Sequence, residues 1–131
     1  MPNHFHFLIR QNSVVSIDKF VSKICTSYVR YFNAKYERVG CLFQDQFKAK
    51  HVDDEAYLLY LTAYIHLNPD DPFTYAYSSL QEYLGPRVQG LTDPSPIFKE
   101  FNTDPEAYRL FLEHYKQDDE EKINHLLFDE E

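Results

Sequence analysis

The chain has 131 residues, including eleven Tyr, eleven Phe and no Trp, and its formal net charge is −8. With three Gly and seven Pro, it has neither a collagen-like nor a disordered composition. No apolar run is as long as a membrane span, and Cys25 and Cys41 do not lie at a metal-site spacing. Because the first residues do not resemble a signal peptide, we expect a cytoplasmic protein with reduced thiols and no membrane partner.

The charge is distributed unevenly along the chain. Residues 1–50 contain eight Lys or Arg and three Asp or Glu, a net charge of +5, whereas residues 51–131 carry −13. A basic part joined to an acidic part can contain a nucleic-acid surface that the total charge conceals. The alternative is that each part is simply solvated through its own charges, and the charge pattern alone favours this alternative.

The first half of the chain is predicted to contain a strand, a helix and an extended segment. Alternating apolar residues indicate a strand over residues 3–10. Apolar residues at three- and four-residue steps indicate a helix that follows Ser16 and runs over residues 17–37. Residues 41–52 are predicted to be extended or to form a hairpin.

The second half is predicted to be mainly helical. Asp53 or Asp54 caps a helix that ends at Asn68, because a residue before proline disfavours helical backbone. The predicted apolar stripe of this helix consists of Tyr57, Leu58, Leu61, Tyr64 and Ile65. The later predictions are a short helix over 78–84, an irregular linker over 86–102, a helix that starts at 103–106 and runs to about 116, and a weak helix over 118–128.

Two histidines lie on one face of the predicted first strand. His4 and His6 are two residues apart, and in a strand this spacing puts their side chains on the same side. Two imidazoles so placed can bind one divalent cation about 2 Å from their nitrogens, but a third ligand must come from elsewhere. The alternative is two neutral histidines that are hydrogen-bonded on a sheet surface, and this is the commoner outcome for an isolated His-x-His.

The helix that is predicted to end at Asn68 offers a potential third metal ligand and a potential nucleophile. Tyr64 and Asn68 are four residues apart, so they share a helical face. The Asn68 amide oxygen is a potential metal ligand, with the Tyr64 phenol one turn away. A phenol is a weak nucleophile at neutral pH because its pKa is about 10, but it can attack a phosphodiester that Mg²⁺ or Mn²⁺ polarises. The alternatives, favoured by spacing alone, are a core tyrosine and a helix-terminal asparagine.

Five stretches carry a resemblance to a known family. In chain order they are MPNHFHFLI (1–9), YFN with RVG (31–40), LFQDQFK (42–48), YIHLNP (64–69) and YAYSSLQEYLG (75–85). This ordered set resembles the IS200-like single-tyrosine transposases, most closely the branch called REP-associated tyrosine transposases. The resemblance covers about residues 1–85.

The resemblance implies a particular chemistry. The family is of the HUH type, in which two histidines separated by a hydrophobic residue bind a divalent metal ion. By resemblance, His4, His6 and Asn68 are the ligands of Mg²⁺ or Mn²⁺, and Tyr64 is the nucleophile. The tyrosine attacks single-stranded, hairpin-bearing DNA, forms a 5′-phosphotyrosine link and leaves a free 3′-OH.

The resemblance also implies a fold and an assembly. The expected fold is an α+β, ferredoxin-like HUH domain over residues 1–85, followed by a linker and helical C-terminal extension over residues 86–131, often in a homodimer. A strand and a helix precede the MPNH strand in the family, so we expect this domain to lack them. Gln46 replaces the usual Arg, and the loop at residues 70–72 is acidic. An alternative function is therefore a catalytically silent relative that binds hairpin DNA or self-associates.

Basic residues of the first half are expected to line the DNA path. They are Lys23, Arg30, Lys35, Arg38, Lys48 and Lys50. Contacts of this kind make binding steeply dependent on salt, and exposed Tyr and Phe rings can stack on unpaired bases. The alternative for these residues is an ordinary solvated helix face.

Overall fold

The computed structural model describes residues 4–85 and 90–118, which form helices joined by irregular segments. The chain divides into two compact units, one made of Phe7–His51 and the other of Met1–His6 with Val52–Glu131. We call them the α1 unit and the core unit. The division into residues 1–85 and 86–131 stays a prediction.

The predicted ferredoxin-like α+β fold is wrong, because the described residues contain no strand. The sequence predicts a strand over residues 3–10 and an extended segment or hairpin over residues 41–52, but residues 4–10 and 41–52 enter no β-ladder. Alternating side chains define the two faces that a strand would have. A strand forms only where a second strand accepts its backbone hydrogen bonds, and among the described residues none pairs with residues 4–10.

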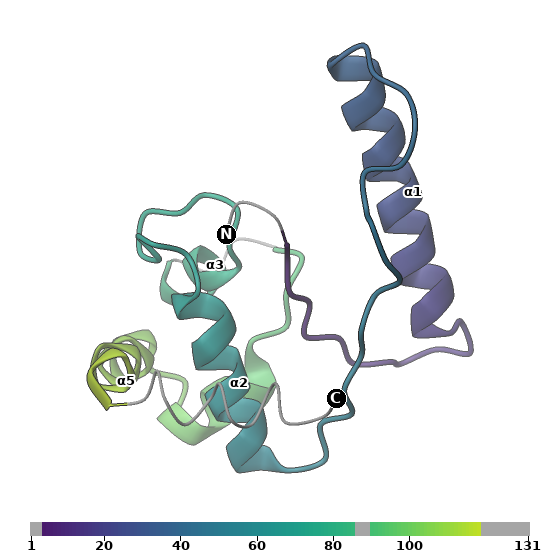
Figure 1. Cartoon of the computed structure of the whole chain (residues 1–131). Coiled ribbons are helices and arrows are strands. Elements are labelled where there is room, and N and C mark those ends of the chain that lie inside the picture. The colour runs from purple at the N-terminus through teal and green to yellow at the C-terminus, as the bar shows by residue number, and fades with distance from the viewer. Residues whose placement is uncertain (1–3, 86–89, 119–131) are drawn as a thin grey trace. The chain divides into compact units, whose positions relative to one another are not determined.

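The α1 unit contains one long helix, α1 (Ile17–Lys35), shown in Figure 1. It begins after Ser16 as predicted, and the Ser16 carbonyl accepts a hydrogen bond from the Phe20 N–H at 3.2 Å. Val21 is the buried residue of the helix. The periodicity of the sequence therefore predicted the helix correctly, but most of its apolar face is not enclosed.

The chain reverses direction after α1. Glu37 and Gly40 have φ values of 50° and 92°, a left-handed conformation that glycine adopts without strain. The Asn33 side-chain N–H donates to the Gly40 carbonyl at 2.9 Å and fixes the turn. The following segment runs back along the helix, with the Phe43 and Tyr28 ring centroids 6.5 Å apart (Figure 1).

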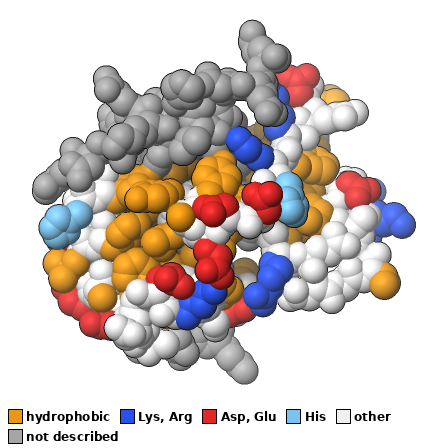
Figure 2. All heavy atoms as spheres, turned by 90° about the horizontal axis from the view of Figure 1, so that it is seen from below, with side chains coloured by type: hydrophobic (Ala, Val, Ile, Leu, Met, Phe, Trp, Pro, Cys, Tyr) orange, Lys and Arg blue, Asp and Glu red, His pale blue; other side chains and the backbone are white. Residues whose placement is uncertain are grey.

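Large apolar side chains reach the surface as well as the core. Figure 2 shows hydrophobic side chains at the surface beside Asp and Glu side chains. Most of the large exposed ones belong to the α1 unit: Phe7, Leu8, Val14, Val15, Phe20, Tyr28, Tyr31, Tyr36, Val39 and Phe47. Single apolar residues are normal at a protein surface, and the α1 unit has more of the large exposed ones than the core unit.

The core unit is helical. Its elements are α2 (Glu55–Leu67), α3 (Leu80–Leu84), α4 (Ser95–Phe98), the 3₁₀ helix η1 (Lys99–Phe101) and α5 (Pro105–Asp118). The Asp54 carboxylate caps α2 by accepting from the Tyr57 N–H at 2.7 Å, as predicted. The helices predicted over 78–84 and after 103–106 are confirmed as α3 and α5. The weak helix predicted over 118–128 lies outside the described residues from 119 onward.

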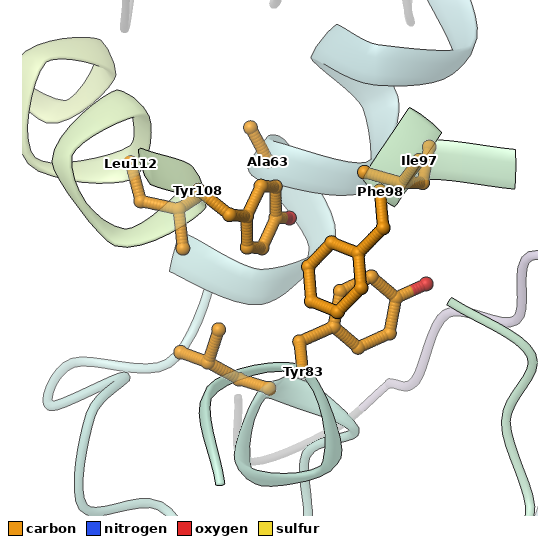
Figure 3. Close-up of a cluster of buried hydrophobic side chains, with 7 residues drawn as sticks. Ala63, Tyr83, Ile97, Phe98, Tyr108 and Leu112 are labelled. Carbon is orange, nitrogen blue, oxygen red and sulfur yellow. The ribbon is translucent and has the colours of Figure 1, made fainter. Parts of the chain in front are cut away.

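The hydrophobic core joins α2, α3, α4 and α5 (Figure 3). Its buried members are Ala63, Leu80, Tyr83, Ile97, Phe98, Tyr108 and Leu112. Tyr83 and Phe98 meet edge to face, with centroids 5.5 Å apart, and Phe98 meets Tyr108 in the same way at 6.0 Å. The prediction of an irregular linker over 86–102 was wrong at α4, because a helix of four residues is too short to show periodicity.

Leu112→Ala is expected to lower the free energy of unfolding by about 2–5 kcal/mol, because it leaves a cavity at a side chain that is fully buried in this core. Urea unfolding followed by circular dichroism measures the change. Leu110→Ala is the matched control, since Leu110 is exposed on the same helix, and its cost should stay below about 1 kcal/mol. Equal losses in the two variants would contradict the assigned core.

Candidate active site

Ring contacts bring together three of the four predicted site residues. The His4 and His6 ring centroids are 5.1 Å apart, and those of His6 and Tyr64 are 5.7 Å apart, both edge to face. All three residues belong to the core unit. The segment of the two histidines therefore lies against α2 at Tyr64, although this segment is not a strand.

One ring nitrogen of His6 is buried. Within the described residues, its Nε2 atom is shielded from solvent and has no hydrogen-bond partner. Burial lowers the pKa of His6, and the neighbouring His4 lowers it further. A neutral imidazole keeps a lone pair on one ring nitrogen, and this is the form in which histidine binds metals.

Asn68 lies one helical turn after Tyr64. It follows the last residue of α2 and keeps helical backbone, with φ −62° and ψ −34°. Tyr64 and Asn68 therefore project from the same side of the helix, and both are partly buried. Among the described residues, no group of three or more His, Cys, Asp and Glu side chains is placed to hold a metal ion. The amide oxygen of Asn68 is a donor of another type.

A third histidine, His66, is the residue that the sequence reasoning missed. It is 2% exposed, and both ring nitrogens are hydrogen-bonded: Nδ1 to the Tyr108 hydroxyl and Nε2 to the Ser79 hydroxyl, each at 2.8 Å. Its ring also meets Tyr83 edge to face, with centroids 4.6 Å apart. Burial lowers the pKa of His66 to about 4. His66 therefore connects the helix of Tyr64 to α5 and to the start of α3.

The buried side of α2 differs from the predicted stripe. The fully buried residues are Thr62, Ala63 and His66, whereas Tyr64 is partly exposed. These three also recur at three- and four-residue steps, so the signal was present in the sequence. Larger apolar residues elsewhere on the helix obscured it, because α2 is apolar on several sides. Tyr64 is therefore not one of the fully buried residues of α2, and its ring contacts His6.

The predicted DNA-binding residues all lie in the α1 unit. Lys23, Arg30, Lys35, Arg38, Lys48 and Lys50 are all exposed. Lys23 and Arg30 are seven residues apart and share a face of α1, whereas Lys35 is about 140° around the helix from Arg30. Lys35 lies instead among aromatic rings, with its Nζ 5.6 Å from the Tyr31 centroid. The structure thus separates the six residues into more than one surface.

Comparison with known families identifies the family of the chain. The family described as Transposase IS200 like matches residues 1–68, just over half of the chain. The chain belongs to this family. The matched range of this IS200-like transposase contains both histidines, Tyr64 and Asn68. Searches among curated proteins and among solved structures find no match.

Membership establishes the general function. The protein is a transposase by family, and a transposase acts on DNA. Within the described residues, no helix of this IS200-like transposase is both long and apolar enough to cross a membrane.

Proposed function

We propose that this IS200-like transposase cuts and rejoins single-stranded, hairpin-bearing DNA through a covalent bond to Tyr64, in the manner of the REP-associated branch that its motifs resemble. The observation that carries the proposal is the contact of His6 with Tyr64, at 5.7 Å between centroids, beside a second histidine. This contact combines a potential nucleophile with nitrogen ligands in one compact unit.

The proposed step transfers a phosphoryl group. The Tyr64 phenol oxygen attacks the phosphorus of a phosphodiester and loses its proton. The bond from phosphorus to the 3′ oxygen breaks, so one DNA fragment leaves with a 3′-OH and the other stays attached to Tyr64 through its 5′ phosphate. Rejoining is the reverse step with a 3′-OH from another strand. No oxidant or other co-reactant is needed.

The residues present fit a divalent metal ion. The buried Nε2 of His6 has no hydrogen-bond partner among the described residues, and the His4 ring is adjacent. His4, His6 and the Asn68 amide would hold Mg²⁺ or Mn²⁺, a donor set of nitrogen and neutral oxygen. When bound, such an ion polarises the scissile phosphate and stabilises its developing charge. The protein supplies the positions of the ligands and of the phenol.

Removal of the metal is expected to abolish the covalent adduct. Hairpin DNA from repeats that flank the gene is labelled at its 3′ end, because the 5′-phosphotyrosine link retains that fragment. With Mn²⁺, a labelled band of higher mass should appear on a denaturing gel. The band should be absent with EDTA and return when excess Mn²⁺ is added.

Two histidine variants test whether the adduct depends on the proposed metal site. His6→Ala should lose most of the adduct, whereas His51→Ala should keep it, because His51 is exposed and lies in the α1 unit. An adduct that forms equally well in EDTA would rule out the metal site. Hairpin binding without any adduct would instead favour the second candidate function, a catalytically silent DNA-binding relative. A homodimer, expected from the resemblance, is measured by sedimentation on the same samples.

A further inference from the structure

The last two turns of α2 are held from the side opposite the candidate site. Each residue of a helix turns the side-chain direction by about 100°, so His66 lies about 160° around the axis from both Tyr64 and Asn68. His66 is buried, whereas Tyr64 and Asn68 are only partly buried. The contacts of the His66 ring therefore restrict how far this turn can rotate or shift behind the two site residues.

Two hydroxyl groups hold the His66 ring, one at each nitrogen. The Tyr108 hydroxyl lies 2.8 Å from Nδ1, and the Ser79 hydroxyl lies 2.8 Å from Nε2. A neutral imidazole has one N–H and one lone pair, so one hydroxyl donates and the other accepts. The phenol is the stronger acid of the two, and burial raises the pKa of Tyr108, so this group keeps its proton. The pairing that follows has Tyr108 donating to Nδ1 and the Nε2–H of His66 donating to Ser79.

Both hydroxyls belong to residues that are themselves fixed in the core unit. Tyr108 is fully buried in the hydrophobic core (Figure 3), with its ring centroid 5.5 Å from that of Tyr83 and 5.2 Å from that of Phe101. The Ser79 carbonyl accepts a hydrogen bond from the Glu82 N–H at 2.9 Å, at the start of α3. Because neither partner is free to follow the ring, the two hydrogen bonds fix His66 in place.

The core needs the ring of Tyr108 but not its hydroxyl. A phenylalanine would bury the same ring, and apolar contacts have no preferred direction. Hydrogen bonds do have one, and a buried polar network whose members are all satisfied specifies a single arrangement of the groups in it. The two hydroxyls therefore add precision of position to this part of α2. Ser79 and Tyr108 both lie beyond Asn68, the last residue of the range that matches the family.

We propose that the hydroxyls of Tyr108 and Ser79 are positioning groups, which act through His66 to hold the turn of α2 that carries Tyr64 and Asn68. They keep the Tyr64 ring at its contact with His6. The importance of this contact for the transfer step rests on the proposed function. The proposal makes α3 and α5 part of the catalytic unit, in addition to their place in the core.

The rate of adduct formation tests the consequence for the reaction. Tyr108→Phe removes one hydroxyl and keeps the buried ring, and Ser79→Ala removes the other. With saturating 3′-labelled hairpin DNA and Mn²⁺, each should form the adduct about 10-fold more slowly, because small displacements of reacting groups are costly. The dissociation constant of the hairpin, measured in EDTA, should stay within about twofold of the original value. Ser79→Thr keeps a hydroxyl and should restore the original rate.

Leu112→Ala is the matched control for stability, because Leu112 is fully buried on the same helix as Tyr108 and has no hydroxyl. At a temperature where circular dichroism shows all variants folded, it should form the adduct at the original rate. The proposal is overturned if Leu112→Ala slows the adduct as much as Tyr108→Phe, because the rate would then follow the stability of the core. Original rates in both hydroxyl variants would overturn it as well.

A second measurement needs neither DNA nor a metal ion. In EDTA, the ring protons of Tyr64 and His6 should give a nuclear Overhauser effect in the original chain, since the two rings meet edge to face. This signal should weaken in Tyr108→Phe and Ser79→Ala and persist in Ser79→Thr and Leu112→Ala. An unchanged signal in the two hydroxyl variants overturns the positioning role. If the original chain forms no adduct, the proposed function fails, and this signal still decides whether the hydroxyls position Tyr64.

Discussion

Tyr64→Phe is expected to abolish the covalent protein–DNA adduct and to leave the binding of hairpin DNA nearly intact. The substitution removes one oxygen, the atom that would attack phosphorus. It keeps the ring that meets His6 edge to face, so the local packing should persist. The adduct is measured on a denaturing gel with 3′-labelled hairpin DNA and Mn²⁺, and binding is measured separately in EDTA.

Tyr60→Phe is the matched control for this experiment. Tyr60 is on the same helix and is exposed, but its ring meets Tyr115 of α5, at 5.9 Å between centroids, rather than a histidine. It should form the adduct at the original rate. If Tyr64→Phe still gives the adduct, Tyr64 is not the nucleophile, and Tyr57 and Tyr60 become the candidates. Loss of the adduct in both variants would point to a general effect on α2.

The helices were predictable because their signals are local. Ser16 and Asp54 precede helices, and a proline follows Asn68, so each boundary depends on a few neighbouring residues. The shared helical face of Tyr64 and Asn68, two residues of the candidate site, follows from helical spacing in the same way. The contact of His6 with Tyr64 joins residues far apart in the sequence, and only the resemblance predicted it.

The strand prediction was wrong because a strand depends on a second segment and not on local signals alone. Alternation at His4 to Arg10 is a property of the segment, whereas a β-ladder is a property of two segments. The rings of His4 and His6 nevertheless lie close together, although their segment is not a strand. Similarly, α4 was missed because it is too short to show a periodic pattern. Its two buried residues, Ile97 and Phe98, pack in the core through contacts with other segments.

His66 is expected to make the stability of the core unit depend on pH. Its pKa is about 4 in the folded chain and 6.5 in the unfolded one, because burial disfavours the charged ring. The unfolded state therefore takes up the proton first as the pH falls. This contribution to stability is present above pH 6.5 and is lost toward pH 4, by about 3 kcal/mol. Urea unfolding at a series of pH values measures the loss.

The substitution His66→Gln isolates this contribution from the carboxyl groups that titrate over the same range. The variant should be less stable at pH 7. Between pH 7 and pH 4, its free energy of unfolding should fall by about 3 kcal/mol less than that of the original chain. His114→Gln, an exposed histidine on α5, should follow the original chain. Parallel curves for His66→Gln and the original would show that the ring is not buried as described.

The same titration determines how the pH dependence of the adduct should be interpreted. His66 accepts or donates through both nitrogens to the hydroxyls of Tyr108 and Ser79, and these bonds hold α2 to its neighbours. Tyr64 and Asn68 flank His66 on that helix. A loss of adduct below pH 6.5 that follows the unfolding curve would therefore report the loss of the helix that carries the site. A loss at higher pH than unfolding would instead point to His6, a proposed metal ligand, because a histidine must be neutral to bind a metal.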